Sequence, residues 1–197
     1  MYCSLKEMEH TMKRWIVTTL IAGMFILGAS TSHRTADADE ADYEALNLIY
    51  LDESIPLPDV SLPDLKGDPV PLLSFRHHVV IINFWTTWCH YCERERAALE
   101  ALYQIYKEDG LAVLAVNMGE TVEQVRAYIE KHGLSFPHVM DPEARAEQAF
   151  GIQATPTNYL IDRRGHVVAG GMGYRDWTGP QAHRLIQRLL AASVESR

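Results

Sequence analysis

The feature that most constrains the fold is an apolar segment, Val79–Trp85, with a helical pattern directly after it. Its β-branched composition predicts a strand that is buried on both faces of a sheet. The pattern that follows predicts a helix from near Cys89 to Glu108, ended by Gly110. Along this helix, Glu95, Leu99, Leu102 and Tyr106 recur at helical spacing. A buried strand that leads directly into a helix indicates an α/β fold.

Strands and helices continue to alternate along the chain. Residues 111–117 predict a second buried strand, and a Thr121–Gln124 capping box predicts a helix that ends at Gly133. Pro142, at the first helical position after Asp141, predicts a shorter third helix.

Two predicted hairpins flank this alternation, with strands at residues 59–62 and 70–73, and at residues 157–162 and 166–169. The first hairpin should add to an edge of the sheet. The turn Arg163–Gly165 joins the second pair, and a last helix covers about residues 179–192. Together the elements predict a three-layer α/β/α sandwich around a mixed central sheet.

The net charge of −8 is concentrated in one short segment. Residues 31–59 hold eight acidic side chains and one basic side chain, whereas residues 60–197 hold sixteen acidic and fourteen basic ones. A body without clustered cations is poorly suited to neutralise phosphates, so we expect no nucleic-acid partner. The composition of residues 31–55 predicts an acidic, solvated spacer before a folded domain at residues 56–197.

Residues 1–30 have the pattern of an export signal behind a short upstream extension. Lys13 and Arg14 precede an apolar run at residues 15–29. This run is shorter than the ~20 residues that span a bilayer, so cleavage is favoured over an uncleaved membrane anchor formed by the same residues. Met12 is a better-placed initiator than Met1, because the residues before it are unusually polar for a signal.

Export changes what the cysteines can do. An exported chain retains only Cys89 and Cys92, since Cys3 precedes the signal. Two cysteines three residues apart close too small a loop to stabilise a fold. The pair lies at a helix N-terminus, where backbone N–H groups stabilise a thiolate. We therefore expect Cys89 to be the exposed nucleophile of thiol–disulfide exchange, and Cys92 to be the more buried thiol that resolves the mixed disulfide.

Two motifs make the chain similar to a known family. Trp85–Cys92, with its Cys-x-x-Cys pair, and Ala154–Thr157 further along resemble the thioredoxin superfamily. The chain also resembles the TlpA/ResA branch of exported, often membrane-tethered thiol–disulfide oxidoreductases, at residues 83–89, 121–137 and 141–142. The likeness covers about residues 57–190. It implies a thioredoxin-like fold with an N-terminal β-hairpin extension and a central βα insertion.

The resemblance implies site-shaping roles for five residues around the cysteines. Pro156 should be a cis proline that faces the pair, and Thr155 should offer backbone groups to an extended substrate. Trp88 should lie on the rim of the site. Tyr91 stands where the family most often has proline, and His90 follows the nucleophile, where a cationic imidazole would lower the pKa of the thiol.

Nearby charged and polar residues modify this expectation. Asn83 occupies the position of a buried acid in thioredoxin, and an amide does not accept a proton from Cys92, so another group or a water must do so. Glu93 and Glu95 would raise the pKa of the nucleophilic thiol, and Arg94 would offset them.

A zinc site offers an alternative use of the same thiols. It would combine Cys89, Cys92 and His90 with His77 or His78. Closed zinc sites take four ligands at separate, compact spacings, which this set lacks. We expect neither a metal nor any other bound cofactor, because the Cys89–Cys92 pair itself is redox-active.

The features together favour a thiol–disulfide oxidoreductase of the bacterial cell envelope. It should be periplasmic or otherwise extracytoplasmic, and should act as a reductant of disulfides in exported proteins, with apocytochrome c as one family-type client. Its electrons would come from a membrane thiol–disulfide reductase. An oxidant role remains open, and so does a redox-switched chaperone that binds clients without turnover.

Overall fold

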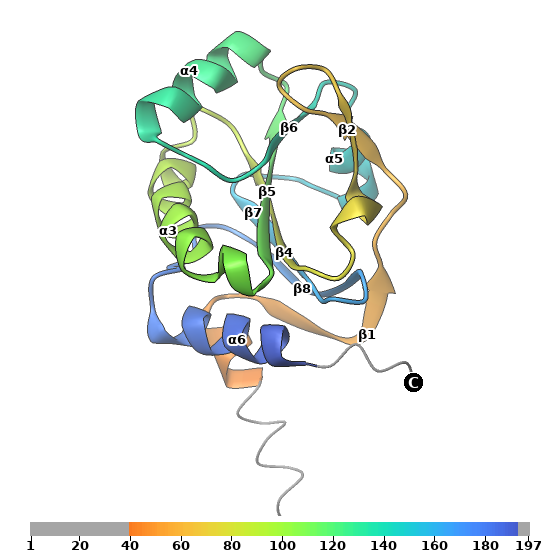
Figure 1. Ribbon diagram of the computed structural model, residues 1–197, viewed down its shortest axis with the longest axis vertical. Helices are drawn as coiled ribbons and strands as arrows, with labels where there is room; N and C mark the ends of the chain where they lie inside the picture. The colour runs from red at the N-terminus through yellow and green to blue at the C-terminus, as the bar shows by residue number, and fades with distance from the viewer. Residues whose placement is uncertain (1–39, 193–197) are drawn as a thin grey trace, which may run out of the picture. The chain divides into compact units, whose positions relative to one another are not determined.

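A six-stranded sheet lies at the centre of the computed structural model, which describes residues 40–192 (Figure 1). The strands lie in the order β1, β8, β7, β4, β5, β6. Their bounds are β1 Ile49–Pro56, β4 Val79–Trp85, β5 Leu111–Met118, β6 His138–Asp141, β7 Thr157–Ile161 and β8 His166–Met172. β4, β5 and β6 run parallel, whereas β7, β8 and β1 each pair antiparallel with their neighbours. The predicted mixed sheet is confirmed.

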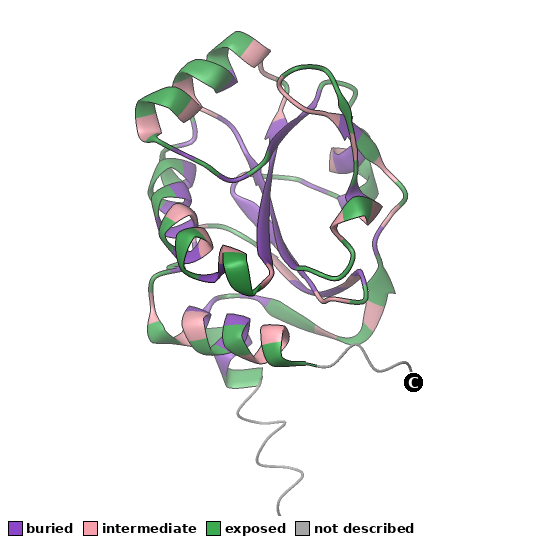
Figure 2. Ribbon diagram, viewed as in Figure 1, coloured by how far each residue is buried: buried purple, intermediate pink, exposed green. Residues whose placement is uncertain are grey.

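Helices on both faces of the sheet complete three layers. α3 His90–Tyr106, α4 Val122–His132 and α6 Pro180–Ala191 contribute to the core on one face. The short α5 Arg145–Phe150 and the 3-10 turn η1 Leu72–Phe75 contribute to the core on the other face. Figure 2 shows the central strands almost entirely buried between these layers. The predicted α/β/α sandwich is therefore confirmed.

The ends of α3 and α4 follow from local sequence. The Thr121 hydroxyl accepts a hydrogen bond from Gln124 N, and the Gln124 side chain accepts one from Thr121 N, which confirms the capping box. Gly133 ends α4 and has a φ of 63°. The 3-10 turn η2 Lys107–Asp109 extends α3, and Gly110, which follows this turn, has a φ of 103°. Both glycines adopt a left-handed conformation that other residues rarely take.

The predicted acidic spacer is wrong for its last part. Residues 40–45 are helical, and β1 pairs with β8 at the edge of the sheet. Asp42 is buried, and its carboxylate forms ion pairs with Arg184 and Arg188 of α6, with N···O distances of 2.7 and 2.8 Å. Composition alone does not distinguish an acidic residue that pairs with a basic helix, as Asp42 does, from one that is exposed to solvent. The domain therefore begins earlier than residue 56.

The helix predicted to open at Asp141–Glu143 begins later. Asp141 ends β6, a strand that the sequence pattern did not indicate, and a turn separates it from α5. The Asp141 carboxylate still caps the helix, because it accepts hydrogen bonds from Arg145 N and Glu147 N, both at 2.8 Å. The acid was correctly associated with a helix start, but Pro142 lies in the turn rather than in the helix.

The first predicted hairpin is confirmed as β2 Ser61–Pro63 paired with β3 Pro69–Pro71. The prediction that it adds to an edge of the central sheet is wrong, because the hairpin forms its own two-stranded sheet and only a single bridge between Asp64 and Val139 connects it to β6. The predicted export signal or anchor, at residues 1–30, lies outside the described residues. Within residues 40–192, no helix is both long enough and apolar enough to cross a membrane.

Candidate redox site

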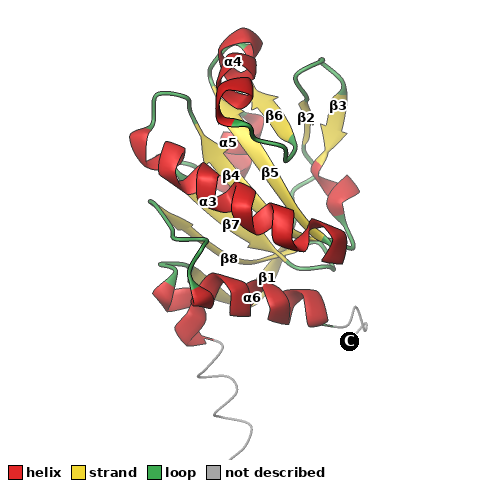
Figure 3. Cartoon of the chain, turned by 60° about the vertical axis from the view of Figure 1, so that its left-hand side comes forward, coloured by secondary structure: helices red, strands yellow, loops and turns green. Residues whose placement is uncertain are grey.

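Cys89 and Cys92 form a disulfide at the junction between β4 and α3, with their Cα atoms 5.2 Å apart. β4 is buried along its whole length and ends at Trp85. Figure 3 shows α3 lying across the face of the sheet. The fully buried strand therefore fixes one end of the loop that carries Cys89, and α3 fixes the other.

The N-terminus of α3 is directed at the first sulfur. Cys89 is the N-cap residue, and its Sγ accepts a hydrogen bond from Cys92 N at 3.2 Å. The side chain of Cys89 is only 8% exposed, so the prediction of an exposed nucleophile is wrong for the oxidised protein, whereas Cys92, at 0%, is the more buried of the two as predicted. A thiolate at Cys89 in the reduced protein would gain this N–H donor and the positive end of the helix dipole.

The peptide bond between Thr155 and Pro156 is cis, as the resemblance predicted. β7 pairs antiparallel with β4, so that Thr157 lies opposite Phe84. This register places Pro156 at the end of the sheet where the chain leaves β4 toward Cys89. The two motifs, far apart in the sequence, are therefore brought to the same end of the sheet.

Three further predicted residues lie on the surface around the pair. Trp88 is 77% exposed and Tyr91 is 61% exposed, which are high values for aromatic side chains. His90 is exposed at the first position of α3, with its ring centroid 6.1 Å from that of Tyr91. Exposed aromatic surface beside a reactive disulfide is suited to contact with a partner polypeptide.

A buried polar cluster lies beneath the disulfide and is centred on Glu95. Glu95 comes one helical turn after Cys92, and both side chains are fully buried. One carboxylate oxygen accepts hydrogen bonds from Asn158 Nδ2 and from the backbone N of Arg175, both at 2.9 Å. The other accepts one from Asn83 Nδ2 at 3.0 Å. Residues from α3, β4, β7 and the segment after β8 therefore meet at one carboxyl group.

Burial raises the pKa of Glu95 to about 7, because the three hydrogen bonds and the charge of Arg175 offset only part of the desolvation. The carboxyl group therefore exchanges a proton near neutral pH. In the sequence, Glu95 belongs to the helical series with Leu99, Leu102 and Tyr106, and only the effect of its charge on the thiol was predicted. An acid at an inward-facing position among apolar residues was the signal that would have identified it.

Arg175 connects this cluster to the segment before β1. It is 1% exposed, and its guanidinium donates hydrogen bonds to the carbonyl oxygens of Asn47 and Gly173 at 2.8 and 2.5 Å. Gly173 N in turn donates to the carbonyl oxygen of Pro156 at 2.7 Å. A Cβ on Gly171 would lie 2.2 Å from the guanidinium, so glycine is needed there. Segments remote in sequence thus support the loop of the cis proline.

A second buried cation, Arg96, lies between aromatic rings on α3. Its guanidinium carbon is 3.8 Å from the ring centroid of Trp85 and 4.4 Å from that of Tyr128. Arg96 is 1% exposed, and its three nitrogen atoms have no acceptor among the described residues. Burial lowers the pKa of this guanidinium. The two rings, with the hydroxyl of Tyr128 and the charges of Glu95 and Glu120, offset part of its lost hydration.

Replacing Arg96 with methionine should raise the free energy of unfolding by about 1 kcal/mol. Each unpaired buried donor destabilises the folded state by ~1–3 kcal/mol, and the contacts with the two rings stabilise it by less than that. Replacing it with alanine should lower that energy by about 3 kcal/mol through the cavity it leaves. Urea unfolding of the oxidised protein measures both changes. A methionine variant that is less stable than the parent would show that the ring contacts outweigh the unpaired donors.

The alternative zinc site is not supported. His77 and His78 precede β4 and Cys89 follows it, so the seven residues of the strand separate them by roughly 20 Å. Among residues 40–192, no group of three or more His, Cys, Asp or Glu side chains is arranged to hold a metal ion. The two thiols are joined to each other in this structure.

Comparison with known proteins agrees with the arrangement of the site. Residues 55–169, more than half of the chain, match the AhpC/TSA family. The chain belongs to the AhpC/TSA family. This AhpC/TSA protein is 44% identical, over 110 residues, to a protein of Geobacillus kaustophilus named thiol-disulfide oxidoreductase ResA. The match covers 56% of this chain and 63% of that relative, slightly less than two thirds of its length.

Solved structures show the same fold. A putative thiol:disulfide interchange protein DsbE from Chlorobium tepidum matches this AhpC/TSA protein with a TM-score of 0.65 and 28% identity, over 71% of this chain and 99% of that one. A putative thioredoxin from Neisseria meningitidis matches with a TM-score of 0.64 and 31% identity, over 72% and 94% of the two chains. The predicted thioredoxin-like fold is therefore confirmed.

Proposed function

We propose that this AhpC/TSA protein is a thiol–disulfide oxidoreductase of the bacterial cell envelope that reduces disulfides in exported proteins. The observation that carries the proposal is the Cys89–Cys92 disulfide, with Cys89 capping α3 at the end of the sheet where Pro156 also lies. The names of the relatives support the same activity. The apolar run at residues 15–29 supports export.

The proposed reaction transfers two electrons from protein to substrate. In the reduced protein, the Cys89 thiolate attacks a substrate disulfide, and the new Cys89–substrate bond forms as one substrate thiolate leaves. The Cys92 thiolate then attacks Cys89, which restores the Cys89–Cys92 disulfide and releases the second substrate thiolate. The substrate gains two thiols, and the protein loses two. A membrane thiol–disulfide reductase would return the protein to its dithiol form, so the cycle needs no bound cofactor.

Glu95 is suited to accept the proton that Cys92 must lose in the second step. Cys92 is fully buried, so water has little access to its thiol. Glu95 is one turn further along the same buried face of α3, and its pKa of about 7 favours proton exchange near neutral pH. This carboxyl group fills the role that Asn83 does not perform.

A trapping experiment tests the proposed function. The Cys92→Ala variant should accumulate covalent mixed disulfides with exported proteins, because the resolving thiol is gone, and reducing agent should release them. The Cys89→Ala variant is the matched control, and it should trap nothing. The reduction potential of the wild-type pair, measured against glutathione, then fixes the direction of electron flow: a potential near that of thioredoxin supports a reductant, and one near that of DsbA an oxidant.

The same experiment separates catalysis from client binding without turnover. If Cys92→Ala forms no mixed disulfides and clients still bind when both thiols are replaced, the protein is a chaperone and the proposed enzyme is excluded. Apocytochrome c is a suitable first client, because its haem-attachment cysteines form a disulfide that must be reduced before haem is added.

A further inference from the structure

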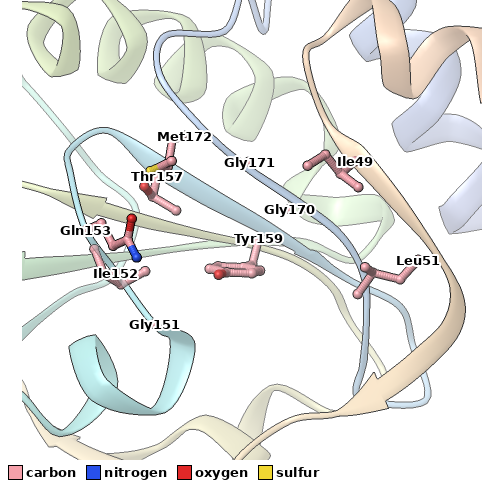
Figure 4. Close-up of a pocket in the computed structure, with 10 residues that line it drawn as sticks. All are labelled: Ile49, Leu51, Gly151, Ile152, Gln153, Thr157, Tyr159, Gly170, Gly171 and Met172. Atoms are coloured by element: carbon pink, nitrogen blue, oxygen red, sulfur yellow. The ribbon is translucent and has the colours of Figure 1, made fainter.

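An apolar pocket of about 350 Å³ opens on the face of the sheet that carries α5 (Figure 4). Its lining comes from β1, β7, β8 and the segment after α5: Ile49, Leu51, Gly151, Ile152, Gln153, Thr157, Tyr159, Gly170, Gly171 and Met172. None of these side chains is charged. Figure 4 shows the Tyr159 ring in the middle, with Ile152 and Gln153 on one side and Leu51 on the other.

The pocket has a fixed floor. The Tyr159 hydroxyl donates a hydrogen bond to the carbonyl oxygen of Phe150 at 2.7 Å, and the Tyr159 ring packs against Phe150 with centroids 5.0 Å apart. Gly170 makes room for this ring, because a Cβ there would lie 2.6 Å from it. The cavity therefore exists before any ligand binds, which lowers the conformational cost of binding.

One end of the pocket adjoins the segment that carries the cis proline Pro156. Thr157 follows the cis proline Pro156 directly, and Gln153 belongs to the same connecting segment. Met172 pairs with Thr157 across β7 and β8, and Gly173, next in the chain, donates its N–H to the carbonyl oxygen of Pro156. The pocket is therefore connected to Pro156 through Thr157 on one strand and through Met172 and Gly173 on the other.

The rim of the pocket exposes apolar side chains. Ile49 is 72% exposed and Met172 is 58% exposed, and they are among the most exposed large apolar residues of the described chain. Burying them against an apolar group of a partner is favourable, at roughly 25 cal/mol per Å². The size of the cavity, its apolar lining and its polar end at Gln153 and Thr157 suit one large apolar side chain with backbone attached.

We propose that this pocket binds a large aliphatic or aromatic side chain of the substrate polypeptide, from the extended segment that flanks the reacting cysteine. The proposal rests on the proposed function and adds a sequence preference to it. It makes this protein selective for unfolded or extended clients with an apolar residue at a set distance from their disulfide. A folded protein keeps such side chains buried, so its disulfides are poorer substrates.

A positional peptide scan tests the proposal. The peptides are serine-rich and contain one cysteine in a mixed disulfide with glutathione, plus a single leucine moved from six residues before the cysteine to six residues after it. The measurement is the second-order rate constant with which each peptide oxidises the reduced wild-type protein. Leucine at one position, or at two alternate positions of an extended chain, should raise the rate constant about tenfold over an all-serine peptide.

Two variants connect that preference to the pocket. Ile49→Lys and Met172→Lys change mostly exposed side chains, and each should reduce the leucine-to-serine ratio below threefold. Ile105→Lys, at an isoleucine of α3 that is 56% exposed and does not line the pocket, is the matched control and should keep the full ratio. These three variants carry the same added charge, so a general charge effect would appear in all of them.

Four results would overturn the proposal. Oxidation by all peptides at similar rates, or a leucine preference that survives both pocket variants, excludes the pocket and leaves the proposed function intact. Failure of every peptide to oxidise the reduced protein contradicts the proposed function itself. A wild-type dimer in sedimentation velocity that Ile49→Lys converts to a monomer would assign the pocket to a second copy of this chain.

Discussion

The Cys89→Ser variant should lose disulfide reductase activity by a factor of a thousand or more in an insulin reduction assay. A serine hydroxyl is scarcely ionised near neutral pH, whereas a thiolate at Cys89 is stabilised by the N–H of Cys92 and by the N-terminus of α3. The sulfur also forms the covalent bond to the substrate, so no neighbouring group replaces it. The measurement is the rate of insulin precipitation with excess dithiothreitol, corrected for the rate without protein.

Cys3→Ser, made like Cys89→Ser in the full-length chain that keeps its first 30 residues, is the matched control, because it changes the one cysteine outside the pair. It should leave the rate unchanged. Cys89→Ser should also remain folded, since serine is a good helix N-cap residue at a position where the cysteine already caps. Full activity in Cys89→Ser would contradict the assigned nucleophile, and activity lost only in Cys3→Ser would move the reaction elsewhere.

The Glu95→Gln variant should remove a pH-dependent loss of stability. The pKa of Glu95 is raised to about 7 in the folded protein, against 4.5 when it is exposed, so the folded state binds more protons between these values. Its contribution to the free energy of unfolding is fully present below pH 4.5 and is lost as the pH rises through 7. The loss approaches about 3 kcal/mol above pH 8. Glutamine does not titrate, so the Glu95→Gln variant should not show this loss of stability at high pH.

Urea unfolding of the oxidised protein at pH 5 to 9 measures this effect as a difference between wild type and variant. The difference is needed because His138, whose pKa burial lowers to about 3, stabilises the protein as the pH rises toward 6.5 and so acts in the opposite direction. Glu93→Gln, at an exposed position of the same helix, is the control and should show no comparable trend. A Glu95→Gln curve parallel to that of wild type would contradict the raised pKa.

The same variant should slow resolution by Cys92. Without a buried proton acceptor, the rate at which Cys92 attacks the Cys89–client mixed disulfide and releases the client should fall about a hundredfold near pH 7, within the usual range for general base catalysis. Attack by Cys89, which lies at the surface end of the helix, should change far less. Quenched-flow separation of the two steps distinguishes this result from a general loss of folding, which would slow both.

The sequence predicted those parts of the fold in which local signals agree. The buried strand Val79–Trp85, the Thr121 capping box and the glycine stop at Gly133 each combine a composition signal with a terminator, and the structure places them within one residue of the prediction. The cis proline Pro156 was accessible only through the resemblance, because a single proline does not indicate its own isomer.

The rest depends on contacts that no local pattern encodes. β1 is a largely exposed strand whose place beside β8 comes from tertiary pairing, and its acidic surroundings suggested a solvated spacer instead. The Glu95 cluster joins residues up to 80 positions apart, so its acid looked like an irregularity in an apolar stripe. In the sequence, Arg96 likewise looks like an ordinary basic residue of a helix. Only the folded structure shows that the rings of Trp85 and Tyr128 pack against its guanidinium.

β1 also affects how the protein behaves when it is concentrated. It forms one end of the sheet, and a free edge strand can pair with the edge of another molecule and so begin aggregation. The pairing of β1 with β8 shifts register between Tyr50 and Ile55, and the exposed acids Asp52 and Glu53 lie in that irregular stretch. Pro56 closes the strand with no N–H to donate. The bend, the charges and the proline together make this edge a poor template for intermolecular pairing.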